Sequence, residues 1–194
     1  MEEPEITVDL ILHAYCKGIF PMADPETGKI DWYQPDPRGI FPIDTYKPKK
    51  SLQNILNRGI FEVRFNTSFE QVIRGCAENR ETWISEEIIS LYTDLFDLGF
   101  AHSVETWRDD LLVGGLYGVA IGQAFFGESM FSRESNASKV ALHHLILRMK
   151  ERNFTLLDTQ FTTSHLEMLG AIYIPHKEYL KRLTKAVKTP AKFD

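Results

Sequence analysis

The chain has 194 residues, of which 43% are hydrophobic and 25% charged, and its formal net charge is −5 at pH 7. A chain of this length buries about 70% of the surface that it exposes when unfolded, so disorder is excluded and one domain, with or without a small appendage, is expected. A protein dedicated to sequence-independent nucleic-acid binding is normally basic overall, and the net charge argues against that class.

The charge is distributed unevenly along the chain. Residues 1–31 hold seven acidic and two basic side chains, whereas residues 175–194 hold six basic and two acidic ones. Residues 44–74 hold six basic side chains against three acidic ones. These two basic segments can contact a polyanion while the whole chain remains acidic.

The first predicted helix covers residues 8–15, where apolar side chains have helical spacing and Gly18 follows as a stop. Residues 30–33 predict a short aromatic strand. Four of the nine prolines then fall within positions 35–48, through which regular structure is not expected to run. We therefore predict a small N-terminal domain of residues 1–46, ending in a proline-rich connection, and a larger domain of residues 47–194.

The larger part predicts helices and strands in a mixed order. Residues 101–107 and 111–120 read as strands joined by a hairpin turn at Arg108-Asp109-Asp110. The other predicted elements are helices at 51–59, 68–76, 85–98, 137–151, 164–169 and 176–187, and strands at 60–65, 123–127, 154–161 and 171–174. Helices, an antiparallel meander and a β-α-β end predict the α+β class.

Two carboxylates stand in apolar surroundings. Asp158 and Gln160 share one face of a buried strand, so Asp158 needs partners or a cavity. It either ties down a neighbouring loop or forms an acid–amide pair at a site. Glu128 follows Phe125-Phe126-Gly127 and is either a salt-bridged edge residue or a carboxylate that receives a cation in an apolar pocket.

Other kinds of site find little support. Neither Cys16 nor Cys76 has a ligand-spaced partner, which argues against a metal site and a disulfide. Gly114-Gly115-Leu116-Tyr117-Gly118 does not match a dinucleotide fingerprint, and no Ser/His/Asp or Cys/His set is readable. Acids follow Met1 and no apolar run reaches about 18 residues, so we expect a cytoplasmic protein that does not contact membranes.

Three aromatic side chains, Trp32, Tyr33 and Trp83, lie next to loops and helix starts. They either pack in the core or stack on an unpaired base.

The chain resembles the bacterial leucyl/phenylalanyl-tRNA–protein transferases in motifs that follow one another over most of its length. The N-terminal ones are Ala14-Tyr15, Gly18-Ile19-Phe20-Pro21, Trp32, Pro35-Asp36-Pro37-Arg38 and Thr82-Trp83-Ile84. The later ones are Ala101-His102-Ser103-Val104-Glu105, Leu112-Val113-Gly114-Gly115-Leu116-Tyr117-Gly118, the block from Phe126 to Lys139, Asp158 with Gln160, His165-Leu166 and Leu169-Gly170-Ala171. The block from Phe126 to Lys139 is the most specific.

The resemblance implies a small N-terminal domain and a C-terminal domain similar to GCN5-type N-acyltransferases. It also implies transfer of leucine or phenylalanine from an aminoacyl-tRNA to the N-terminal amine of proteins, typically those beginning with Arg or Lys, which marks them for degradation by the N-end rule pathway. The implied partners are Leu-tRNA or Phe-tRNA and acceptor proteins with exposed N-termini.

The resemblance also implies roles for residues. Asp158 and Gln160 match the catalytic pair, and Glu128 matches an acidic site residue. Trp83 and the Trp32-Tyr33 pair fall where the family holds the terminal adenosine of the tRNA. The family's apolar pocket for the amino-acid side chain falls at Leu116, Phe125, Met130, Leu142, Leu145 and Leu157. Tyr33 and Leu145 depart from the family, which usually has tryptophan and an aromatic residue there, and the N-terminal part is shorter than in many members.

The residues fit this chemistry. The tRNA ester is already activated, so no covalent step, metal or nucleotide cofactor is needed, and the site has to align the amine with the ester carbonyl. We expect Asp158 to orient Gln160 and Gln160 to contact the amine. An apolar pocket discriminates between amino acids by about 1 kcal/mol of binding free energy for each methylene group of the side chain.

Two other functions remain as alternatives. An acetyl-CoA-dependent N-acetyltransferase would need a glycine-containing pyrophosphate loop at a helix start, and Arg133-Glu134-Ser135-Asn136-Ala137-Ser138 lacks the glycines. A non-catalytic adaptor for tRNA or protein N-termini is the other alternative, against which the presence of both Asp158 and Gln160 argues.

Overall fold

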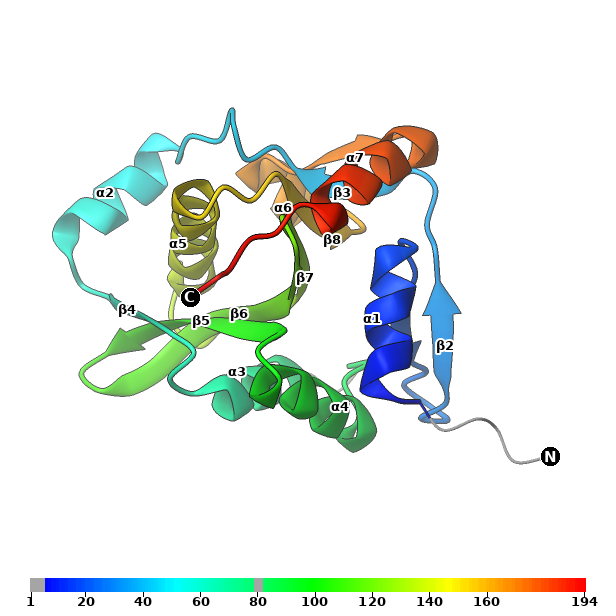
Figure 1. Ribbon diagram of the computed structural model, residues 1–194. Helices are drawn as coiled ribbons and strands as arrows, with labels where there is room; N and C mark the ends of the chain where they lie inside the picture. Colours follow the sequence, from blue (N-terminus) through cyan, green and yellow to red (C-terminus); the bar gives the residue numbers. More distant parts are fainter. Residues whose placement is uncertain (1–5, 79–81) are drawn as a thin grey trace.

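The computed structural model describes residues 6–78 and 82–194 and contains two sheets (Figure 1). In the N-terminal part, α1 (Val8–Cys16) is followed by an antiparallel pair of strands, β1 (Phe20–Ala23) and β2 (Ile30–Tyr33). The larger sheet has seven strands in the order β4-β5-β6-β7-β8-β3-β9. The described part of the chain therefore confirms the α+β class.

Apart from one unpredicted strand at 38–41, the elements of the larger part follow the predicted order, and the strand predicted at 123–127 extends to Ser132. The strands are β3 (Arg38–Phe41), β4 (Glu62–Phe65), β5 (Ala101–Arg108), β6 (Leu111–Ile121), β7 (Ala124–Ser132), β8 (Leu156–Gln160) and β9 (Ile172–Ile174). The helices are α2 (Lys50–Arg58), α3 (Phe69–Ala77), α4 (Glu86–Asp97), α5 (Ala137–Glu151), α6 (Ser164–Leu169) and α7 (His176–Lys188).

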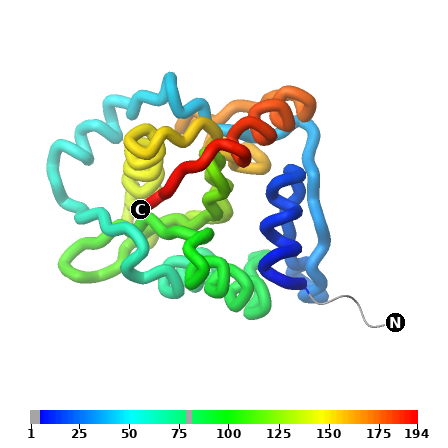
Figure 2. Tube along the Cα trace, viewed as in Figure 1, coloured from blue at the N-terminus to red at the C-terminus, as the bar shows by residue number. Residues whose placement is uncertain are grey.

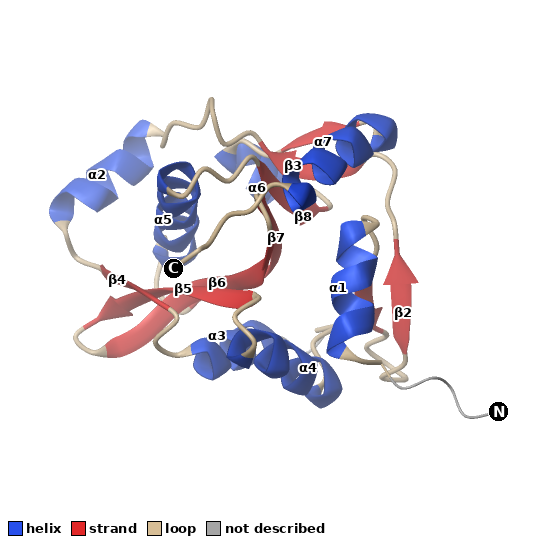
Figure 3. Cartoon of the chain, viewed as in Figure 1, coloured by secondary structure: helices blue, strands red, loops and turns tan. Residues whose placement is uncertain are grey.

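The large sheet separates two apolar cores (Figure 3). Helices α1, α3, α4 and α7 contribute buried side chains to the core on one face. Helix α5 packs on the other face, where the C-terminal segment also ends (Figure 2). Phe193 closes this second core, with its ring centroid 5.3 Å from that of Phe125.

Strand β3 corrects the prediction that no regular structure runs through the proline-rich stretch. Residues 38–41 contain no proline, and they pair antiparallel with both β8 and β9. Gly39 is required there, because a Cβ atom on it would lie 2.6 Å from the carbonyl carbon of Phe161. Part of the expected connection thus belongs to the large sheet, while the division at residue 46 stays a prediction.

No helix in residues 6–78 and 82–194 is long and apolar enough to cross a membrane.

Candidate active site

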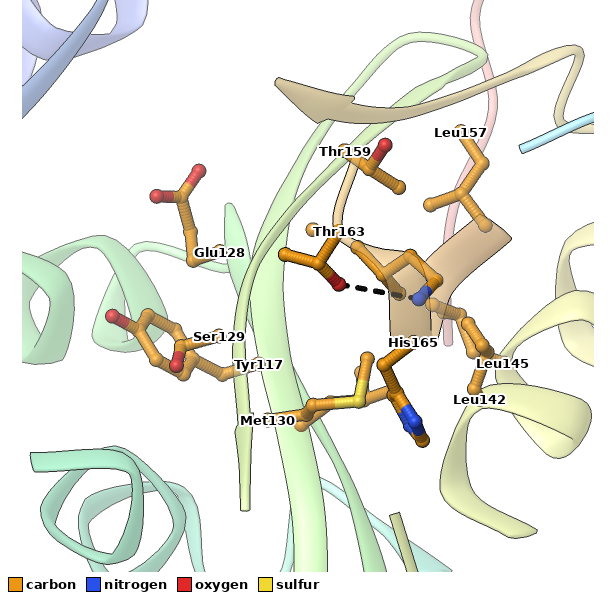
Figure 4. A pocket seen from close by; sticks show the side chains of 13 residues that line it. Tyr117, Glu128, Ser129, Met130, Leu142, Leu145, Leu157, Thr159, Thr163 and His165 are labelled. Carbon is orange, nitrogen blue, oxygen red and sulfur yellow. Dashed lines mark hydrogen bonds between the residues drawn. The ribbon is translucent and has the colours of Figure 1, made fainter. Parts of the chain in front are cut away.

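A cavity of about 230 Å³ opens where β7 and β8 separate (Figure 4). These two strands are parallel neighbours, and their pairing ends at Phe126 and Asp158. Beyond that point the cavity lies between them, with its wall completed by β6, α5 and residues of the 163–166 segment. A ligand can therefore enter between the two strands without breaking backbone hydrogen bonds of the sheet.

A β-bulge shapes this opening. Tyr117 faces Ser129 and Gly118 faces Gly127, so Glu128 is an extra residue in β7 without a partner in β6. Gly118 permits the bulge, because a Cβ atom there would lie 2.2 Å from the Phe126 carbonyl oxygen. The bulge turns the Glu128 side chain toward the face of the sheet that carries α1 and α4.

The cavity wall on the α5 face is apolar. Five of the six residues expected to hold the amino-acid side chain line it: Leu116, Met130, Leu142, Leu145 and Leu157. Phe125 does not line the cavity. It is fully buried behind that wall, where its ring packs on Phe193.

Asp158 is fully buried and ion-paired with a buried arginine, Arg38 of β3. Arg38 Nε donates to Asp158 Oδ1 at 2.9 Å and Nη2 donates to Oδ2 at 2.7 Å. Tyr179 of α7 donates its hydroxyl to Oδ2 at 2.6 Å, and the Gln160 backbone N–H donates to Oδ1 at 2.9 Å. Four donors thus occupy this carboxylate, which satisfies its charge within the protein.

Gln160 ends β8 in a left-handed backbone conformation, with φ of 55°. Such a conformation is costly for a residue other than glycine and persists where neighbouring groups fix it. Here Asp158 holds the Gln160 backbone N–H. The side-chain Nε2 donates to Glu128 Oε1 at 3.1 Å, whereas the amide oxygen accepts no hydrogen bond from the described residues.

Glu128 lines the cavity and remains partly exposed. It accepts a hydrogen bond from the Tyr15 hydroxyl at 2.6 Å, and the Tyr92 hydroxyl lies 2.5 Å from the Tyr15 hydroxyl and 3.3 Å from Glu128 Oε2. Burial raises the pKa of the Glu128 carboxyl to about 8, and the negative charge of Asp158 acts in the same direction.

Comparisons with known proteins agree with the motifs of this site. Residues 40–184 match the family model of the leucyl/phenylalanyl-tRNA protein transferase, and residues 4–36 match the model of the N-terminal domain of that protein. The chain belongs to the leucyl/phenylalanyl-tRNA protein transferase family.

Similar relatives carry the same name. The leucyl/phenylalanyl-tRNA–protein transferase of Gloeobacter violaceus is 50% identical over 97% of this chain and 97% of its own length. That of Chlorobium limicola is 52% identical over 94% of this chain and 96% of its own length. Among solved structures, the ribosomal-protein-alanine N-acetyltransferase of Brucella melitensis biovar Abortus 2308 is 13% identical with a TM-score of 0.41, covering 56% of this chain and 86% of its own.

The aromatic residues expected to hold the tRNA end lie on the α1 side of the transferase. Trp32 and Tyr33 of β2 are each 38% exposed, and Tyr33 stacks on Phe20 with 6.1 Å between ring centroids. Phe20 in turn meets the edge of Phe161, the residue after Gln160, at 5.9 Å. Trp83 is half-buried against the core of that face.

Sequence reasoning missed the residues that surround the two carboxylates. Arg38 stood in a motif of the transferase family, but no role was assigned to it. Its role could have been predicted only indirectly, because a buried aspartate such as Asp158 requires a cation or several hydrogen-bond donors as partners. Tyr15 likewise stood in a family motif, Ala14-Tyr15, without an assigned role, and Tyr92 and Tyr179 were not singled out. In the described residues, no group of three His, Cys, Asp or Glu side chains is arranged to hold a metal ion.

Proposed function

We propose that this transferase moves leucine or phenylalanine from an aminoacyl-tRNA to the N-terminal amine of an acceptor protein. The main support is the position of the apolar cavity. It lies on the α5 face of the sheet and opens through the gap between β7 and β8. The hydrogen-bonded pair of Gln160 and Glu128 lies beside this gap, on the opposite face of the sheet. The side chain of the amino acid enters the cavity while its ester carbonyl stays in the gap, next to polar groups.

The cavity accounts for the donor class. Its wall of leucine and methionine side chains favours a large apolar side chain, and the described residues that line its α5 side include no Lys, Arg, Asp or Glu. A charged aminoacyl group would lose its hydration there without a partner. Trp32 and Tyr33, which are each 38% exposed, and the half-buried Trp83 then hold the terminal adenosine, because aromatic rings can stack on a base.

The acceptor amine binds at Gln160. Its nitrogen meets the Gln160 amide oxygen, and Glu128 supplies a negative charge for an ammonium group. Asp158 acts through the backbone, because its oxygens are occupied by Arg38, Tyr179 and the Gln160 N–H. Alignment of the amine and the ester then accounts for the acceleration.

One assay tests the proposal. Purified protein is mixed with tRNAs charged with leucine, phenylalanine, alanine or lysine, and with peptides that begin with Arg, Lys or Ala. We expect amide formation with the leucyl and phenylalanyl donors only. Aminoacyl-tRNA binding without transfer to any peptide would support the adaptor alternative, and transfer from acetyl-CoA would support the acetyltransferase.

Reducing the cavity should change the choice of donor. Leu145→Phe fills part of the apolar end, so we expect the ratio of kcat/KM for phenylalanyl over leucyl donors to fall by about tenfold or more. The matched control is Leu147→Phe, the same change at a position on α5 that is 46% exposed. Equal ratios in Leu145→Phe and the wild type would place the donor side chain elsewhere.

Binding of the donor should weaken as salt rises. Within the described part of the chain, the lysines of residues 47–50 and the exposed lysines of α7 form no ion pair, whereas Arg64 and Arg74 are paired with nearby glutamates. Contacts to phosphates release counterions, so log Kd should rise linearly with log salt concentration. A Kd that does not change between about 50 and 200 mM salt would contradict phosphate docking.

A further inference from the structure

The transfer leaves open which group takes the proton from the attacking amine. A peptide α-amine has a pKa of about 7.7–8.0, so much of it arrives as ammonium near neutral pH, and ammonium has no lone pair with which to attack. Gln160 is an amide and does not accept a proton at such pH values. Another side chain at the opening between β7 and β8 can do so.

Asp158 is poorly placed for this role. Its side chain has no exposed surface, and Arg38, Tyr179 and the Gln160 N–H occupy its oxygens. To take a proton it would have to give up a bidentate ion pair, which is costly in a buried position. Its contribution is to hold Gln160 in place.

Glu128 differs from Asp158 in its exposure and in its partners. It stands on the bulge at the rim of the cavity, is partly exposed there, and lies within hydrogen-bond distance of Gln160. The Tyr15 hydroxyl donates a hydrogen bond to it, and the Tyr92 hydroxyl lies within hydrogen-bond distance of both Tyr15 and Glu128, so the two tyrosines stabilise the carboxylate together. Figure 4 shows its carboxylate directed away from the leucine side chains of the cavity.

We propose that Glu128 is the general base of the transfer reaction, a role that rests on the proposed function. Its carboxylate removes one proton from the acceptor ammonium, and the nitrogen lone pair forms the C–N bond to the ester carbonyl carbon. Collapse of the tetrahedral intermediate breaks the C–O bond to the ribose oxygen, which leaves with the proton from Glu128. Glu128 then takes the second proton of the nitrogen and releases it to solvent. The products are the amide and the free tRNA hydroxyl.

The surroundings of Glu128 suit this exchange. The groups that face it are Tyr15 of α1, Tyr92 of α4, Tyr117 of β6, Asp158 of β8 and Arg38 of β3. Burial raises the pKa values of all three tyrosines, so they stay neutral across the working pH range. With the pKa of Glu128 raised to about 8, its affinity for a proton matches that of an α-amine.

The test is the pH dependence of kcat/KM for an acceptor peptide. The active forms are the Glu128 carboxylate and the ammonium, so wild-type activity should rise as Glu128 loses its proton near pH 8 and fall at higher pH as the ammonium does. In Glu128→Gln, kcat should drop by about 10² to 10⁴-fold, and the remaining rate should rise with pH without an alkaline fall, because only the free amine reacts. Formate should partly restore Glu128→Ala.

The control is Glu62→Gln, a surface glutamate paired with Arg64, whose pH profile should match the wild type. Thermal melts of each variant check that folding is intact. If the wild type transfers but Glu128→Gln keeps its rate and its bell-shaped profile, the base assignment is wrong and the proposed function stands. If Glu128→Gln raises only the KM for acceptors with a cationic first side chain, Glu128 binds that side chain instead. A wild type without transfer activity would overturn the proposed function itself.

Discussion

Gln160→Ala is expected to lower kcat/KM for transfer by about 10²-fold or more while leaving the Kd for aminoacyl-tRNA within about twofold, since misplacing a reacting group costs rate rather than binding. The backbone at this position is left-handed, and alanine is no better suited to it than glutamine, so the change removes only the side chain. Single-turnover kinetics with charged tRNA measures the loss, and filter binding measures the Kd.

A remote glutamine is the control for this experiment. Gln71→Ala alters an exposed position on α3 and should transfer at the wild-type rate. Asp158→Asn should behave like Gln160→Ala in transfer, because it weakens the hold on the Gln160 backbone. Wild-type transfer rates in both Gln160→Ala and Asp158→Asn would contradict the catalytic role of Gln160 and the positioning role of Asp158.

Arg38→Met should reduce the free energy of unfolding by about 3–5 kcal/mol, because it leaves the carboxylate of Asp158 buried without its counter-ion. Arg38 also donates to the Gly18 carbonyl oxygen at 2.9 Å and lies over the Tyr179 ring, so several contacts are lost together. Denaturant titration followed by circular dichroism measures the change.

The same substitution at the surface provides the comparison. Arg64→Met breaks an exposed pair with Glu62 and should cost less than about 1 kcal/mol. The double variant with Arg38→Met and Asp158→Asn should be more stable than Arg38→Met alone, because the uncompensated charge is then gone. If Arg38→Met costs no more than Arg64→Met, the buried pair does not hold the site together.

Local patterns predicted those elements whose stability is local. Helix α5 was expected at 137–151 and spans Ala137–Glu151, and the hairpin turn carries left-handed residues at Asp109 and Asp110. Strands β1 and β3 were missed. Each has four residues, and β3 is defined by pairing with β8 and β9, which lie more than 100 positions away in the chain.

In the site, too, local sequence patterns identified some residues, whereas their partners from distant segments were not predicted. The apolar sequence around Asp158 and the aromatic residues before Glu128 identified both carboxylates as candidate site residues. Asp158 contacts Gln160 through the Gln160 backbone N–H, while the Gln160 side chain lies against Glu128. The partners of both carboxylates come from distant segments, and no spacing rule identifies them.

The ion pair of Arg38 with Asp158 affects when, during synthesis and folding of the chain, the catalytic centre forms. Its two residues are 120 positions apart, Tyr15 and Glu128 are 113 apart, and Tyr179 joins from the last helix. Contacts so distant in sequence are slow to form because the intervening chain must first be ordered. A nascent chain that still lacks α7 leaves Asp158 without one of its donors, so the catalytic centre is completed only after α7 has been synthesised.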